Sequence, residues 1–314
     1  MFDVLAGLMP TIVNLLLPTL TLVASLSAAD PTVLADLVDP AAMVEKLGSG
    51  CKWAEGPVWL DWDGGFLVFS DIPNNRMFKW TQAEGMTIWR ARASYSNGNI
   101  QDREGRLVTC EQGGRRVAVT TPDGTITPMV ASYNGKRFTA PNDIVEKTDR
   151  TLWFTDPAYN PKKVASEMAG NWVYRHDPAS GVTTVVSKDF DMPNGLCFAP
   201  DEKVLYISDT GKPRHIRAYG VQADGSLAEG RVFVTFEKGW GLPDGMRCDE
   251  RGNLWASAGD GVRIFAPDGR FIGHIPCPEK CANLCWGGAD RRTVFLTSTT
   301  SLYRIPVKVG PAVR

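Results

Sequence analysis

The chain has 314 residues, and its 34 basic and 35 acidic side chains leave it almost without net charge. Because it contains no lysine- or arginine-rich cluster and no RNA-binding signature, nucleic acid is not expected as a partner. Its 31 glycines, 21 prolines and ten tryptophans are typical of tight turns and aromatic-rich strands, and they argue against a helical bundle.

Residues 1–29 form a short apolar extension, which is expected to be helical. Residues 27–29 resemble a signal-peptide cleavage site, but no Lys or Arg precedes Lys46, and Pro10 and Pro18 interrupt the apolar run. Three interpretations stay open: an atypical export signal, a helix that associates with a membrane surface, or a helix packed on the domain. The cytoplasm is slightly favoured, and export to the periplasm is the alternative. Any membrane association would use this segment alone.

Residues 30–314 are expected to form a single domain. Its first part is a polar connector with a predicted strand at residues 43–47. We expect this strand to pair with the C-terminal strand at residues 302–307, because joining the two chain ends in one sheet removes the exposed edges of an open ring.

One pattern recurs along this domain. An acidic or amide residue stands before a glycine or another turn-forming residue, and two apolar runs separated by a Gly/Asp turn follow it. The residues that begin the six copies, called the anchors below, are Glu55, Asn97, Asn142, Asn194, Asp244 and Asn283. A repeat of roughly 40 to 50 residues made of short strands is typical of a propeller. The sequence therefore predicts an all-β fold, a six-bladed β-propeller. Residues 157–171 are a longer insert that is expected to form a loop over one face of the ring.

The anchors are expected to converge, because the first strand of each blade lines the central channel of a propeller. They supply two carboxylates and four amides, and they include no His or Cys. Such an all-oxygen set suits one hard divalent cation, with Ca²⁺ favoured and Zn²⁺, Mn²⁺, Mg²⁺ or Fe²⁺ as alternatives. The competing interpretation is structural, since Asn-Gly and Asp-Gly are common turn dipeptides.

Two further sets of residues are open to interpretation. The predicted second strands end in carboxylates, which either cap the strands or orient the amide anchors. These carboxylates are Asp71, Glu111, Asp156 and Asp209. Cys277, Cys281 and Cys285 are four residues apart and lack the paired C-x-x-C spacing of zinc sites. We interpret them as structural thiols and assign them no role.

Several segments resemble the regucalcin/gluconolactonase (senescence marker protein) family of six-bladed propeller hydrolases. The resemblance covers residues 50–308. The segments that carry it are Ala54-Glu55-Gly56-Pro57, Pro141-Asn142-Asp143, Met192-Pro193-Asn194-Gly195 and Leu242-Pro243-Asp244-Gly245. Residues 97–99, 110–116 and 153–157 resemble the bacterial gluconolactonase branch more narrowly.

The resemblance implies roles for particular residues. Glu55, Asn194 and Asp244 would bind one divalent cation, and Asn142 would complete this set or contact substrate. Asp244 is also the implied general base. Ala140 departs from the animal branch, which has an arginine two residues before the Asn.

The resulting hypothesis is a metal-dependent lactonase that opens an aldono-lactone such as glucono-1,5-lactone, a small-molecule partner, to its acid. Asn97, Asn142 and Asn283 would hold substrate hydroxyls. Two alternatives stay open: a phosphotriester or phosphofluoridate hydrolase that uses the same metal, and a non-catalytic metal-binding propeller scaffold. The pattern specifies no oligomeric state.

Overall fold

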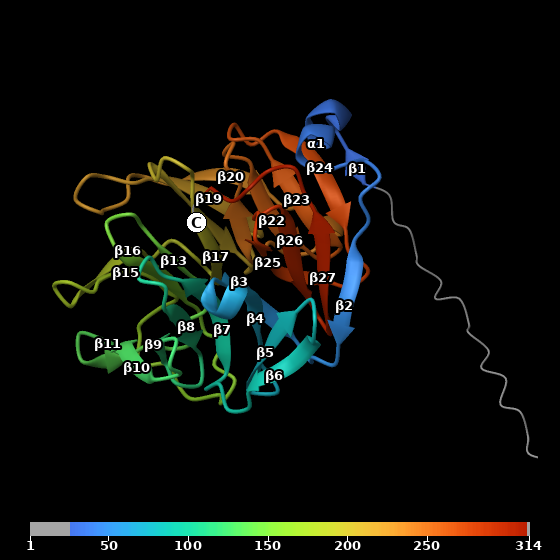
Figure 1. Ribbon diagram of the computed structural model, residues 1–314. Coiled ribbons are helices and arrows are strands. Elements are labelled where there is room, and N and C mark those ends of the chain that lie inside the picture. The colour runs from blue at the N-terminus through green and yellow to red at the C-terminus, as the bar shows by residue number, and fades with distance from the viewer. Residues whose placement is uncertain (1–25, 313–314) are drawn as a thin grey trace, which may run out of the picture.

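The structure is a computed structural model that describes residues 26–312. Six antiparallel sheets stand around a central axis, which confirms the predicted six-bladed β-propeller (Figure 1). The first strands of neighbouring blades contact one another in turn, and the last contacts the first, so the ring is closed.

The blades follow one another along the chain. Blade one contains β3 (Ala54–Leu60), β4 (Phe66–Asp71), β5 (Arg76–Thr81) and β6 (Gly85–Arg90). Blade two contains β7 (Ser96–Gln101), β8 (Leu107–Glu111), β9 (Arg116–Thr120) and β10 (Ile126–Val130). Blade three contains β13 (Ile144–Glu146), β14 (Leu152–Asp156), β15 (Trp172–Asp177) and β16 (Val182–Ser187).

Blade four contains β17 (Pro193–Phe198), β18 (Val204–Asp209), β19 (His215–Gly220) and β20 (Arg231–Thr235). Blade five contains β21 (Met246–Cys248), β22 (Leu254–Ala258), β23 (Gly261–Phe265) and β24 (Phe271–Pro276). Blade six contains β25 (Cys281–Gly287), β26 (Thr293–Ser298), β27 (Ser301–Pro306) and, from the start of the chain, β2 (Glu45–Ser49).

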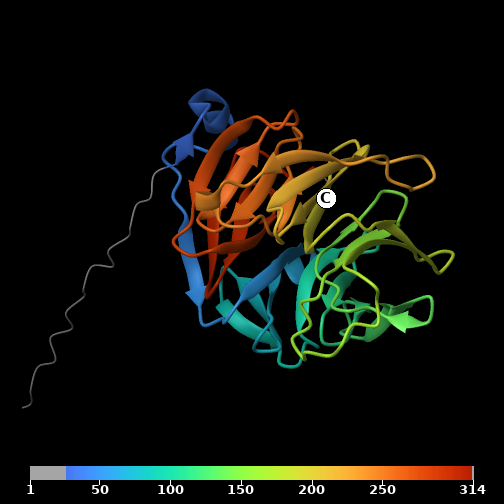
Figure 2. The same ribbon diagram turned by 180° about the vertical axis from the view of Figure 1, so that it is seen from behind.

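The pairing of β2 with β27 confirms the predicted closure of the ring by the two ends of the chain (Figure 2). Glu45 lies opposite Arg304 and Lys46 opposite Tyr303. The strand begins at Glu45, two residues later than expected. Blade six therefore has its outer edge supplied by the N-terminal part of the chain, and no blade is left incomplete.

The segment before β2 packs on blades five and six. β1 (Ser27–Ala28) pairs with β24 as a fifth strand, so these two residues are extended where a helix was expected. The N-cap of α1 (Pro31–Leu37) is Asp30, whose side chain accepts a hydrogen bond from the Val33 N–H. The helix buries Leu34 and Leu37. The rest of the apolar segment, residues 1–25, lies outside the described residues. Within residues 26–312, no helix has the length and apolar character needed to cross a membrane.

Smaller elements connect the blades. A short hairpin of β11 (Ser132–Tyr133) and β12 (Lys136–Arg137) joins blades two and three, and two 3₁₀ turns occur at Trp62–Gly64 and Lys238–Trp240. The insert at residues 157–171 is a loop, as predicted. It lies against the neighbouring blades: the Asn160 side chain donates to the Thr139 carbonyl, and the Lys162 ammonium donates to the Gly113 carbonyl.

Candidate active site

All six anchors lie at the same end of the ring of first strands. Glu55, Asn97 and Asn194 are the second residues of β3, β7 and β17, and Asn283 is the third residue of β25. Asn142 and Asp244 stand two residues before β13 and β21, at the same phase of the repeat as the other anchors. In the four longer strands the pairing register shifts beside the anchor, so each of these strands is bulged there.

The glycines that follow the anchors are required by packing more than by turn geometry. Gly56 alone among these glycines has a positive φ, of 51°. A Cβ on Gly98 would lie 2.6 Å from the Asn142 carbonyl oxygen, and a Cβ on Gly195 would lie 2.3 Å from that of Asp244. Only glycine lets neighbouring strands approach this closely. The simple turn interpretation of these dipeptides is therefore wrong at Gly98 and Gly195.

Hydroxyl side chains on the second strands fix the anchors of the next blade. Each lies one residue before a strand-ending carboxylate and donates to an anchor carbonyl. The pairs are Ser70 Oγ to Asn97 O at 2.8 Å, Thr155 Oγ1 to Asn194 O at 2.8 Å, and Ser208 Oγ to Asp244 O at 2.9 Å. The sequence signal was the recurrent Ser/Thr-Asp ending, which sequence analysis did not use.

Three of the strand-ending carboxylates hold the backbone that leads into an anchor. Each carboxylate accepts hydrogen bonds from two main-chain N–H groups, which belong to the residues three and two positions before the anchor. Asp71 binds Lys52 and Trp53, Asp156 binds Thr139 and Ala140, and Asp209 binds Asp191 and Met192. Glu111 instead pairs with Arg116 at 2.6 Å. These carboxylates position the anchors through the main chain, because none of their recorded hydrogen bonds within residues 26–312 reaches an anchor side chain.

Five anchors line one cavity of about 460 Å³ at this end of the ring. They are Glu55, Asn97, Asn142, Asn194 and Asp244. Asn283 does not reach the cavity wall. Its side chain packs against Gly245 and lies beside the Glu55 carboxylate, and its Oδ1 accepts the Leu284 N–H at 2.8 Å.

Other residues of the cavity wall were missed by sequence reasoning. They are Trp53, Ile72, Gln112, Tyr159, Thr210, Leu242 and Lys280. Tyr159 belongs to the insert, so the predicted loop does contribute to the site. Its hydroxyl lies beside Thr210 and close to Asp244, and burial raises its pKa, so it stays protonated. Lys280 is exposed and adds a positive charge at the wall.

The two carboxylates of the cavity share an unfavourable environment. Burial raises the pKa of Glu55 to about 7. Burial and then the neighbouring charge of Glu55 raise the pKa of Asp244 well above its usual range. Asp244 Oδ1 is buried and has no hydrogen-bond partner among residues 26–312. Buried anionic oxygens without a counter-charge are costly, so this arrangement suits a positive charge placed between them.

The seven cysteines are free and buried. Cys277 and Cys281 both lie beside Ser298, with Cys277 Sγ 3.2 Å from its Oγ. Cys285 lies apart from them, in the wall of a different cavity. In the described part of the chain, no group of three or more His, Cys, Asp or Glu side chains is placed to hold a metal. The anchor set differs from such a group because two of its four proposed ligands are amides.

Residues 53–300 match the family model described as SMP-30/Gluconolactonase/LRE-like region, so the chain belongs to this family. It is 32% identical to a gluconolactonase of Zymomonas mobilis, over 87% of this chain and 83% of that protein. A pentonolactonase of Haloferax volcanii is 27% identical over 80% of this chain and 82% of its own.

Solved structures agree with this assignment. A putative gluconolactonase superposes with a TM-score of 0.85 at 34% identity, over 91% of this chain and 99% of its own. A gluconolactonase from Xanthomonas campestris superposes with a TM-score of 0.83 at 32% identity, over 90% and 95%. The family resemblance inferred from the sequence is thus confirmed.

Proposed function

We propose that this protein is a metal-dependent lactonase that hydrolyses a sugar lactone of the aldono-lactone type, such as glucono-1,5-lactone, to its acid. The observation that carries the proposal is the convergence of five anchors, two of them carboxylates, on one cavity. Relatives named gluconolactonase, pentonolactonase and 6-deoxy-6-sulfogluconolactonase support a sugar lactone as the substrate class.

The residues of the cavity fit one divalent cation. Glu55, Asn142, Asn194 and Asp244 would hold it, because all four offer oxygen and the two carboxylates neutralise a double charge. Asp244 Oδ1 is buried without a hydrogen-bond partner among the residues that the structure describes, so a cation bound beside it would compensate its negative charge. An all-oxygen set favours Ca²⁺, with Mg²⁺ and Mn²⁺ next among the alternatives. A cation held there would polarise the lactone carbonyl and stabilise the negative charge that forms on its oxygen.

Side chains of this protein carry out the proton transfer and hold the substrate. Asp244 acts as the general base and accepts a proton from the attacking water as the water oxygen bonds to the carbonyl carbon. The ring carbon–oxygen bond then breaks, and the leaving alkoxide takes up the proton that Asp244 accepted, which gives the open hydroxy acid and restores the Asp244 carboxylate. Asn97 and Asn142 hold substrate hydroxyls, and Asn283 orients Glu55, which it contacts.

This function is tested by the hydrolysis of glucono-1,5-lactone, followed by proton release against the uncatalysed rate. We expect Asp244→Asn to lower kcat by ~10²-fold or more, because the amide cannot accept the proton. The matched control is Asp224→Asn, which changes the Asp of another Asp-Gly pair. Asp224 lies in an exposed turn, where its carboxylate accepts a hydrogen bond from the Ser226 N–H. The control should keep wild-type turnover.

Two results would overturn the proposal. A wild-type rate no faster than the uncatalysed reaction, across aldono-lactones of both ring sizes, would remove the lactonase function. Near-normal turnover by Asp244→Asn would leave the function but remove Asp244 as its base.

A further inference from the structure

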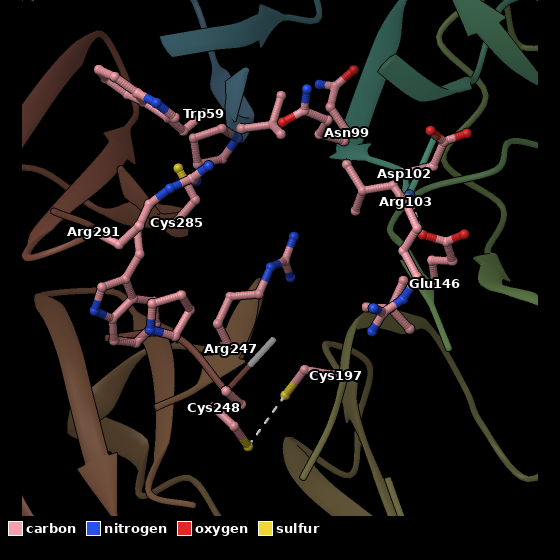
Figure 3. Close-up of a pocket in the computed structure, with 18 of the residues that line it drawn as sticks. Trp59, Asn99, Asp102, Arg103, Glu146, Cys197, Arg247, Cys248, Cys285 and Arg291 are labelled. Atoms are coloured by element: carbon pink, nitrogen blue, oxygen red, sulfur yellow. Dashed lines mark hydrogen bonds between the residues drawn. The ribbon is translucent and has the colours of Figure 1, made fainter. Parts of the chain in front are cut away.

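A second cavity, called the far cavity, lies at the opposite end of the ring, since its wall is formed by residues that follow the anchors along the first strands. Figure 3 shows side chains that line it. Its volume is about 470 Å³, and all six first strands contribute to its wall through residues that follow the anchors. It shares no lining residue with the candidate active site. The far cavity is therefore a separate opening of the same central channel.

Two cysteines meet in the wall of the far cavity. Cys197 of β17 and Cys248 of β21 come from neighbouring blades, and their sulfur atoms are 3.8 Å apart (Figure 3). Both side chains are almost fully buried, with 4% and 3% exposed, yet both line the cavity. A small molecule that enters the far cavity thus meets the two sulfurs together.

The surroundings distinguish these two thiols from each other. A hydrogen bond with Cys197 and burial raise the pKa of Cys248, and either sulfur can be the donor in this S–H···S contact. Arg247 points into the same cavity and lies near enough to Cys197 for their charges to interact. Because a neighbouring cation favours attack by a cysteine sulfur, the position of Arg247 places Cys197 as the sulfur that reacts first.

We propose that Cys197 and Cys248 form an oxidation site, at which a peroxide that enters the far cavity joins blades four and five by a disulfide. The Cys197 sulfur attacks one oxygen of hydrogen peroxide, which gives a sulfenic acid and one water. The Cys248 sulfur then displaces the sulfenic hydroxyl as a second water. Two thiols lose two protons and two electrons, and one peroxide is reduced to two waters.

The geometry requires only a small adjustment. The sulfurs must approach by roughly 1.8 Å to reach the ~2.0 Å of a disulfide bond. β17 and β21 pack side by side, so a rotation of the two side chains and a slight approach of the strands would bring this about. The bond would tie β17, which carries Asn194, to β21, which follows Asp244.

The test uses the full chain, reduced and then treated with hydrogen peroxide. We expect the free thiols to fall from seven to five, and peptide mapping to find one internal Cys197–Cys248 link. The link closes a long loop, so the oxidised protein should unfold at a Tm higher by ~5 °C or more. Reduction with a dithiol should restore both the thiol count and the Tm.

Variants make the assignment specific. Cys197→Ala and Cys248→Ala should each abolish the link. The control is Cys51→Ala, which removes a buried thiol just before β3 and should leave the link intact. A wild-type protein that keeps seven thiols, that links a different pair, or that oxidises Cys197 and Cys248 separately to sulfinic acids would overturn the proposal. The wild-type peptide map decides this even where a variant fails to fold.

Discussion

At the scale of single residues, the anchors and their glycines act as pairs. At Glu55, Asn97, Asn194 and Asp244 the anchor side chain lines the cavity, and the glycine that follows it lets the next blade's anchor approach closely. A lactonase site of this kind depends on the close spacing of side chains from different blades, because no single strand carries more than one proposed metal ligand.

Replacing Gly195 by alanine should destabilise the protein by about 3 kcal/mol, because the added Cβ would lie 2.3 Å from the Asp244 carbonyl oxygen and force the two strands apart. Urea denaturation measures this loss. Gly239→Ala is the matched control, since a Cβ there meets nothing within 4 Å. Equal free energies of unfolding for the two variants would contradict the packing role of Gly195.

The identity of the anchors could be predicted from the sequence because they recur at one phase before an apolar strand. The place of Asn283 could not, because its contacts with Glu55 and Gly245 come from other blades and follow only from the assembled ring. Tyr159 and Lys280 carry no repeated pattern. Tyr159 lies in the insert loop and Lys280 directly before β25, and only the assembled ring brings the two residues to one cavity.

At the scale of elements, the strands and the closure were predictable, since both follow from alternating apolar runs and turn residues. β1 and α1 were not, because a two-residue strand and a seven-residue helix leave almost no periodic signal. Their positions are set by tertiary contacts: α1 buries Leu34 and Leu37 against blades five and six.

The closure of blade six provides a test that depends on pH. The Glu279 carboxylate accepts hydrogen bonds from the Thr300 N–H at 2.7 Å and the Tyr303 hydroxyl at 2.9 Å, and it pairs with Lys46 of β2 at 3.5 Å. Burial alone would raise the pKa of Glu279, but the hydrogen bonds of Ser301 and Thr300 outweigh it and lower the pKa to about 2. The charged form therefore stabilises the closed ring.

Because this pKa is lowered from 4.5 to about 2, the stabilisation is complete above pH 4.5 and is lost as the pH falls toward 2. Glu279→Gln should unfold at a lower Tm than wild type at pH 7, and the difference should shrink over that window. Glu229→Gln, at an exposed position, is the control and should match wild type throughout. A Tm difference for Glu279→Gln that does not change with pH would argue against this account.

At the scale of the whole molecule, the ring has one cavity at each end. One end collects five anchors, among them the carboxylates of Glu55 and Asp244, and the other holds Arg247 and the Cys197–Cys248 pair. The Asp143–Arg247 ion pair, at 3.2 Å, links the residue that follows the anchor Asn142 to a residue that lines the far cavity. The family assignment and the geometry together favour lactone hydrolysis at the anchor end.

The most direct test of this account is the rate of glucono-1,5-lactone hydrolysis by chelator-treated protein as single divalent cations are returned, measured in parallel on Glu55→Gln. The account predicts that the chelator abolishes the wild-type rate, that one cation restores it, and that Glu55→Gln needs far more of that cation or does not recover. A wild-type rate that persists in full after verified removal of bound metal would contradict it.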